Sequence, residues 1–137
     1  MNTYSNLAYV AAGGAFGSVM RYVVATQVMS KTTLLAAPWG VFPAGTLAVN
    51  LIGCLIMGLL AALASSFDWL NHEGKLLLMT GVLGGFTTFS AFGLETFNLL
   101  RKNEWLIAGT YISASVLLGL LAVVIGFYLG AALQNAT

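Results

Sequence analysis

Four long apolar stretches, joined by short polar links, make up most of the chain. They cover residues 7–29, 43–67, 76–100 and 105–133. A helix needs about 20 predominantly apolar residues to cross the hydrocarbon core of a bilayer, and each stretch is at least that long. None of them alternates apolar and polar residues over about ten positions, as the strands of a membrane barrel do. The pattern predicts an all-α membrane protein whose residues 1–137 form a single domain of four transmembrane helices.

The links between the spans predict how the helices are connected. Residues 101–104 are so few that the third and fourth spans are expected to form an antiparallel hairpin. The link at residues 30–42 contains Pro38 and Trp39 and is expected at the level of the lipid headgroups, where Trp is favoured. The polar link at residues 68–75 contains the only histidine, His72. We interpret it as a solvated loop residue because no cysteine or second histidine is near it in the sequence.

Composition and charge narrow the class of protein. Only 7% of the residues are charged, whereas soluble domains have about 25%. A net charge of +1 gives no electrostatic basis for binding nucleic acid. Residues 1–6 contain no Lys or Arg, so the first span is not expected to be a cleaved signal peptide. Lys75 stands on one side of the membrane and three basic residues on the other, a small bias that only weakly favours external termini. Insertion in either orientation is conceivable.

The third span contains an unusual segment, residues 81–95, with the sequence GVLGGFTTFSAFGLE. Glycine lets the backbone leave helical geometry. In lipid, a broken helix is tolerated only where protein covers it or where it lines a water-filled cavity. We therefore predict that the third helix is broken near its middle and that an ion or substrate path passes the break.

Four helices form too small a bundle to enclose a polar conduit while satisfying every backbone group. Transport would therefore require oligomerisation. Small residues spaced four apart let helices approach closely, either between subunits or within one. Three glycine pairs have this spacing: Gly13 and Gly17, Gly81 and Gly85, and Gly126 and Gly130.

Polar residues inside membrane spans are candidates for function because burying them is costly. Asn50 is near the middle of the second span, where its amide could donate hydrogen bonds to an anion or join two helices. Tyr111 and Ser115 are four apart and share one face of the fourth span. They could pass an ion along, although a serine in a membrane helix usually bonds its own backbone.

Two phenylalanines, Phe89 and Phe92, are three apart and therefore neighbours on the third span. Such a pair normally packs against other apolar groups. Here it lies among the hydroxyls of Thr87, Thr88 and Ser90 and follows the glycine-rich segment. The positive edge of a phenyl ring can stabilise an anion without offering it a hydrogen bond.

Arg21 and Glu95 lie at similar depths from the same side of the membrane. We interpret them as a salt bridge or as a pair in a vestibule. Arg21 could also concentrate anions at a pore mouth. No titratable pair is predicted in the middle of the membrane, which argues against a proton-coupled carrier.

These features resemble the small bacterial fluoride channels of the CrcB family, also called Fluc. Residues 13–22 (GGAFGSVMRY) and 45–53 (GTLAVNLIG) are similar to the family's first and second helical motifs. Residues 84–92 (GGFTTFSAF) are similar to its third-helix signature, which is the most specific of the motifs. Tyr111 and Ser115 match the fourth helix, so the resemblance covers essentially the whole chain.

The resemblance implies an antiparallel, dual-topology homodimer with two pores in the cell inner membrane. It implies that Asn50, Phe89 and Phe92 line the fluoride path, and that the backbone carbonyls of Gly84 and Thr87 hold a structural sodium ion at the dimer centre. No organic cofactor is implied. Further pore hydroxyls are expected from Thr88, Ser90, Tyr111 and Ser115.

Two positions depart from the family pattern. Ala91 stands where the family often has threonine, and Gly119 stands where some members have serine. A hydroxyl is therefore missing at each position, and the end of the polar track on the fourth helix changes.

The predicted function is passive, fluoride-selective conduction that lowers cytoplasmic fluoride by export. One alternative is a small multidrug-type exporter, which would need a membrane-embedded carboxylate in the first span, where this chain has only Arg21. Another alternative is a non-transporting assembly subunit. It would explain the glycine pairs but not Asn50 together with the polar third span. The sequence shows no nucleophile and base that would indicate an enzyme.

Overall fold

The computed structural model describes residues 3–33, 42–64 and 70–135, which are helical apart from short links. Four stretches are long and apolar enough to cross a membrane: Thr3–Thr32, Ala44–Leu63, His72–Arg101 and Trp105–Asn135. The prediction of an all-helical protein with four spans is therefore confirmed. Pro38 and Trp39, and residues 65–67 of the predicted second span, lie outside the described residues.

The third span is divided into several elements, whereas each of the other spans is one helix. The helices in chain order are α1 (Thr3–Thr33), α2 (Ala44–Leu63), α3 (His72–Lys75), the π-helix η2 (Leu76–Leu83), α4 (Gly84–Phe86), α5 (Phe89–Arg101) and α6 (Trp105–Asn135). Short α3 is capped by Asn71, whose side chain accepts a hydrogen bond from the Gly74 N–H, as asparagine does at many helix starts.

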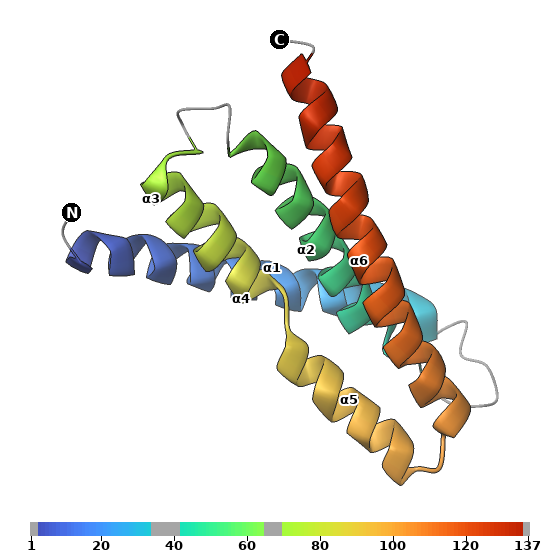
Figure 1. Ribbon diagram of the computed structural model, residues 1–137. Helices are drawn as coiled ribbons and strands as arrows, with labels where there is room; N and C mark the ends of the chain where they lie inside the picture. Colours follow the sequence, from blue (N-terminus) through green and yellow to red (C-terminus); the bar gives the residue numbers. More distant parts are fainter. Residues whose placement is uncertain (1–2, 34–41, 65–69, 136–137) are drawn as a thin grey trace.

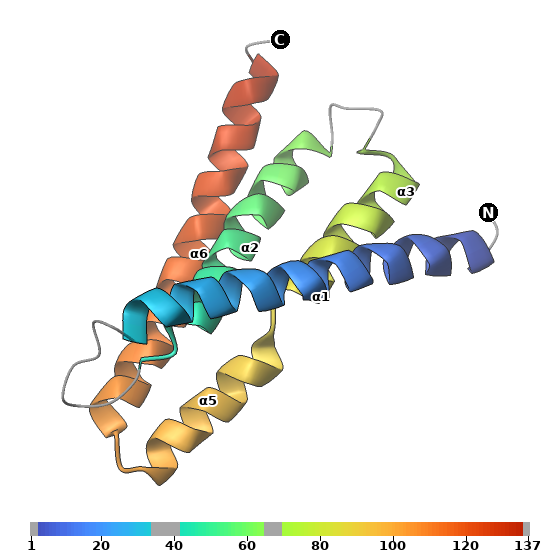
Figure 2. The same cartoon turned by 180° about the vertical axis from the view of Figure 1, so that it is seen from behind.

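The helices form two packed groups around α2. Helices α2 and α6 lie side by side, and α1 crosses both α2 and the η2–α4 segment (Figures 1 and 2). Helix α5 continues beyond the link at residues 87–88 and packs against the beginning of α6. The turn between α5 and α6 contains Asn103 at φ 62°, a left-handed conformation that asparagine tolerates better than most residues.

Glycines allow these helices to touch backbone to backbone. A Cβ atom on Gly17 would overlap the carbonyl oxygen of Val82, and one on Gly126 would overlap the carbonyl oxygen of Leu55. The other members of the three glycine pairs make similar close contacts with helices of the same subunit: Gly13, Gly81, Gly85 and Gly130. The sequence left open whether these glycines serve contacts between subunits or contacts within one chain. The structure shows that they serve contacts within one chain.

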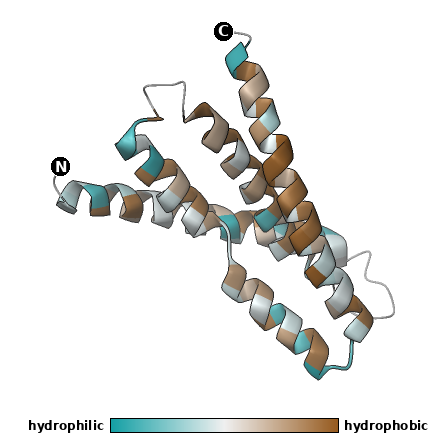
Figure 3. Ribbon diagram, in the orientation of Figure 1, coloured by the Kyte–Doolittle hydropathy of each residue, from teal (hydrophilic) through white to brown (hydrophobic). Residues whose placement is uncertain are grey.

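Little of the apolar surface is buried inside this single chain. One small cluster contains Leu60, Leu70 and Leu83, and another contains Leu99, Ala108 and Tyr111. Many hydrophobic residues of α6 remain exposed, and much of its ribbon has the brown colour of hydrophobic residues (Figure 3). An exposed apolar area of this extent marks a surface that contacts lipid or another protein.

Candidate functional site

The third span is interrupted where the sequence changes from glycine to threonine. Helix α4 ends at Phe86, and α5 begins at Phe89. Between them Thr87 (φ −80°, ψ 156°) and Thr88 (φ −149°, ψ 109°) are extended. The Thr88 hydroxyl accepts a hydrogen bond from the Ala91 N–H at 3.2 Å and so caps the start of α5.

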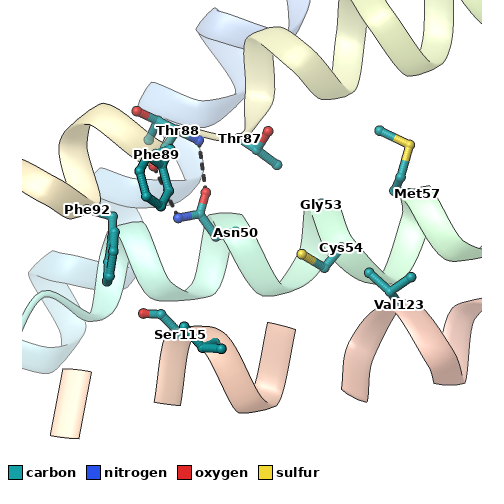
Figure 4. Close-up of a pocket in the computed structure, with 11 residues that line it drawn as sticks. Asn50, Gly53, Cys54, Met57, Thr87, Thr88, Phe89, Phe92, Ser115 and Val123 are labelled. Atoms are coloured by element: carbon teal, nitrogen blue, oxygen red, sulfur yellow. Dashed lines mark hydrogen bonds between the residues drawn. The ribbon is translucent and has the colours of Figure 1, made fainter. Parts of the chain in front are cut away.

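Asn50 of α2 pairs with the backbone of this interruption. Its Oδ1 accepts a hydrogen bond from the Thr88 N–H at 2.9 Å, and its Nδ2 donates to the Thr88 carbonyl at 3.2 Å (Figure 4). Buried backbone groups that leave a helix need such partners. An amide nitrogen has two N–H donors, and the second one on Asn50 has no partner among the described residues. Asn50 thus joins two helices and retains a donor for a ligand.

The same hydrogen bonds remove the usual partners of two carbonyl groups. In an α-helix the N–H of residue i donates to the carbonyl of residue i−4. The Thr88 N–H, which would bond the Gly84 carbonyl, donates to Asn50 instead. The Ala91 N–H, which would bond the Thr87 carbonyl, donates to the Thr88 hydroxyl. Gly84 is also an exposed residue in the single chain.

A cavity of about 320 Å³ lies beside the interruption, between α2, α5 and α6 (Figure 4). It is lined by Asn50, Gly53, Cys54, Met57, Thr87, Thr88, Phe89, Phe92, Ser115, Val116 and Val123. The Ser115 hydroxyl oxygen is buried and has no hydrogen-bond partner. A buried hydroxyl without a partner is destabilising, and Ser115 is one of the residues that line this cavity.

Aromatic rings form one side of this cavity. The ring centroids of Phe89 and Phe92 are 5.4 Å apart, and those of Phe92 and Tyr111 are 5.2 Å apart. Phe92 is half-buried, whereas 84% of Phe89 is exposed in the single chain. The Phe89 side chain therefore extends the aromatic row from the subunit interior to its surface.

Tyr111 and Glu95 meet in a hydrogen-bonded group that the sequence did not indicate. The wholly buried Tyr111 donates its hydroxyl to Glu95 Oε2 at 2.7 Å. Thr46 of α2 donates to Glu95 Oε1, also at 2.7 Å. Sequence reasoning missed Thr46, although it is one helical turn before Asn50 and so shares a face with it.

This arrangement bears on two expectations about individual side chains. Among the described residues, Glu95 forms no ion pair with Arg21, and both of its oxygens accept hydrogen bonds from neutral hydroxyls. The alternative of a vestibule pair stays a prediction. Tyr111 and Ser115 also differ in their surroundings: Ser115 lines the cavity, whereas the Tyr111 hydroxyl binds Glu95. The proposed hydroxyl track on the fourth helix is therefore not continuous within the subunit.

Arg21 lines a second cavity, of about 340 Å³, on the α1 side of the interruption. Its wall contains Ser18, Arg21, Tyr22, Ala25, Thr46, Val49, Thr88 and Ala91. Thr88 is common to both cavities. Ser90 is exposed, with its hydroxyl 3.3 Å from the Thr88 hydroxyl, and lines neither of them.

The fold and the site define a small multi-pass membrane protein whose polar groups gather around an interrupted helix, an arrangement typical of membrane transport. The chain matches the family described as "CrcB-like protein, Camphor Resistance (CrcB)" over residues 8–127, and it belongs to this family. The resemblance inferred from the sequence is thereby confirmed.

Relatives named "Fluoride-specific ion channel FluC" match most of the chain. The protein from Methylobacillus flagellatus is 46% identical over 120 residues, which cover 88% of this chain and 90% of the relative. The protein from Helicobacter pylori strain J99 is 45% identical over 121 residues, covering 88% and 89%. The one from Rhizobium etli is 47% identical over 117 residues, covering 85% and 89%. These names describe ion channels, in agreement with the prediction that the chain is not an enzyme.

Proposed function

We propose that this protein is a passive, fluoride-selective channel of the bacterial inner membrane that lowers cytoplasmic fluoride by export. The observation that carries the proposal is the pairing of Asn50 with Thr88 beside a cavity that contains an unpartnered Ser115 hydroxyl. The names of the relatives supply the ion. The geometry supplies donors suited to an anion.

Fluoride is small and strongly hydrated, so a selective path must replace its water with compact donors. The second N–H of Asn50 and the Ser115 hydroxyl are such donors. The rings of Phe89 and Phe92 can add their positive edges. None of these four groups carries a full positive charge that would hold the ion, so fluoride can leave as readily as it enters.

Passive movement of fluoride down its concentration gradient would protect the cell from fluoride that accumulates in the cytoplasm. Hydrogen fluoride is a weak acid that crosses membranes in its neutral form and dissociates in a less acidic cytoplasm. Fluoride then accumulates inside, and a passive channel lets it out. No coupling ion is needed for this direction of flow.

We further propose that two chains associate as an antiparallel homodimer with two pores. One chain alone cannot enclose a polar path with four helices, and Phe89 is 84% exposed in it. A second subunit packed on this face would cover the ring and close the cavity. The small difference between Lys75 on one side and Lys31, Arg101 and Lys102 on the other is compatible with insertion in both orientations.

The carbonyls of Gly84 and Thr87 suit a structural sodium ion in this dimer. Both have lost their helical donors to Asn50 and Thr88, and carbonyl oxygens can replace the water around a monovalent cation. A two-fold axis near the interruption would bring four such carbonyls together. The ion would supply a positive charge that compensates carbonyl groups left without N–H partners and would join the subunits.

Efflux from liposomes tests the function directly. Purified protein is reconstituted into liposomes loaded with potassium fluoride or potassium chloride, and valinomycin is added to release the potassium. We expect rapid fluoride efflux and retained chloride, with protein-free liposomes as the control. Equal rates for both anions would contradict selectivity, and no fluoride efflux from folded, reconstituted protein would contradict the channel assignment.

A further inference from the structure

The cavity wall contains the only cysteine of the chain, Cys54. Cys54 is one helical turn after Asn50 on α2, so the two side chains share a helix face. Its Sγ would be 3.7 Å from a Cβ atom on Gly119 of α6. The thiol therefore lies opposite a position where α6 has no side chain, and nothing from Gly119 covers it.

The cavity has the properties of a space that a ligand enters. Its volume of about 320 Å³ compares with roughly 30 Å³ for one molecule in liquid water. The Ser115 hydroxyl in its wall is buried without a hydrogen-bond partner. Water or an anion that enters the cavity would come close to Cys54 and to the other groups of its wall.

We propose that Cys54 faces the ion path and that a soft, thiophilic metal ion attaches to its thiol there and blocks conduction. The blocking part of this proposal rests on the proposed channel function. Thiolate sulfur is a preferred ligand of soft metals. With mercuric chloride the S–H bond breaks and an S–Hg bond forms, while one proton and one chloride ion leave; no atom changes its oxidation state.

A single sulfur holds the metal in this arrangement. Met57 also lines the cavity, but its thioether sulfur points away from the Cys54 thiol (Figure 4). Residues one turn apart on a helix have Cβ atoms about 5–6 Å from each other. A mercury atom on Cys54, with its remaining chloride, would therefore occupy space next to the Asn50 amide.

The test uses proteoliposomes of the full-length protein treated with mercuric chloride. Intact-protein mass reports the adduct, and the initial rate of fluoride efflux reports conduction. We expect one mercury per chain and at least a tenfold fall in efflux, reversed by dithiothreitol. In Cys54→Ser and Cys54→Ala we expect no adduct and an efflux rate that mercury leaves unchanged from each variant's own untreated rate.

A matched control moves the thiol away from the cavity. Ala61 is exposed on the same helix, so the double variant Cys54→Ser, Ala61→Cys should form the adduct without losing efflux. The proposal is overturned if wild-type protein forms no adduct, if it forms the adduct and conducts as before, or if Cys54→Ser is blocked equally. Absence of efflux before mercury is added would contradict the channel function instead, and the adduct mass would still decide whether the thiol is reachable.

Discussion

At the scale of single residues, the amide of Asn50 has two tasks at once. It pairs with both backbone groups of Thr88 and keeps one N–H without a partner among the described residues. The first task stabilises an extended residue inside a membrane span, where unsatisfied backbone groups cost several kcal/mol each. The second is the one by which we expect the same side chain to bind an anion. Substitutions at Asn50 therefore need separate readouts of assembly and of flux.

Replacing Asn50 with Asp should abolish fluoride flux. Two like charges 4 Å apart repel by about 4 kcal/mol at an effective dielectric constant of 20, which corresponds to roughly a thousandfold lower rate. The Oδ1 acceptor for Thr88 is kept, so dimers should still form. Asn98→Asp, the same change at an exposed position of α5, is the matched control. Wild-type flux in dimeric Asn50→Asp protein would remove Asn50 from the path.

Phe89→Ile and Phe92→Ile should each lower fluoride flux per folded dimer at least tenfold, because isoleucine keeps apolar bulk and lacks the positive ring edge. Phe92 also contacts Tyr111, so its loss should cost about 0.5–1.5 kcal/mol of stability. Phe97→Ile is the control, since Phe97 is exposed on α5 and lines neither cavity. If efflux normalised to folded protein is unchanged in both test variants, the rings only pack.

At the scale of helices, close backbone contacts hold the interrupted span in place. Helix α1 crosses η2 at Gly13 and Gly17, and α2 meets α6 at Gly126. Because Thr88 pairs with Asn50 of α2, the position of Thr88 relative to Asn50 depends on how these helices cross. The glycines thus affect the site without touching it.

Gly126→Ala should destabilise the protein, because the new methyl group would overlap the Leu55 carbonyl. Overpacking of this kind typically costs about 1–3 kcal/mol. Gly109→Ala is the control, since a Cβ atom there meets nothing within 4 Å. Thermal unfolding in detergent, followed by tryptophan fluorescence, should show a lower midpoint for Gly126→Ala than for Gly109→Ala. Equal midpoints would mean that α2 and α6 can separate at little cost.

At the scale of the whole molecule, the described part of the single chain leaves an aromatic ring and two backbone carbonyls without neighbours that would cover or bind them. Its aromatic row ends in the exposed ring of Phe89, and the carbonyls of Gly84 and Thr87 have no helical donors. A second, inverted copy packed on this face would cover the ring and bring its own carbonyls close to these. A sodium ion held there would be structural, because it would join two subunits and lie outside the fluoride path.

Fluoride flux should therefore not follow the sodium gradient. With sodium present on both sides to keep the site filled, reversing a tenfold gradient should leave the initial efflux rate and the reversal potential for fluoride unchanged. A potential that moves with the sodium gradient would show cotransport. Separately, a structure of the dimer without density between the two interruptions would contradict the sodium site alone.

The sequence by itself determined the membrane class, the four spans and the chemical groups available to an ion. Length and hydropathy are sufficient for the spans, because a helix in lipid must satisfy its own hydrogen bonds. The glycine and threonine run of residues 84–88 pointed to the third span, and Asn50 and Phe92 were identified as polar or aromatic residues in apolar surroundings.

Only the tertiary structure decided which of these groups meet. Thr46 and Glu95 are 49 residues apart, and Asn50 and Thr88 are 38 apart, so no local pattern could pair them. The sequence suggested Arg21 and Glu95 as a salt bridge or a vestibule pair because they lie at similar depths from the same side of the membrane. The fold instead brings Thr46 and Tyr111 to that carboxylate. The sequence also did not show which helix packs against each glycine pair. A glycine lets another helix approach closely but does not specify which helix that is. Partners across a bundle are fixed by the crossing of helices, which depends on the packing of the whole chain.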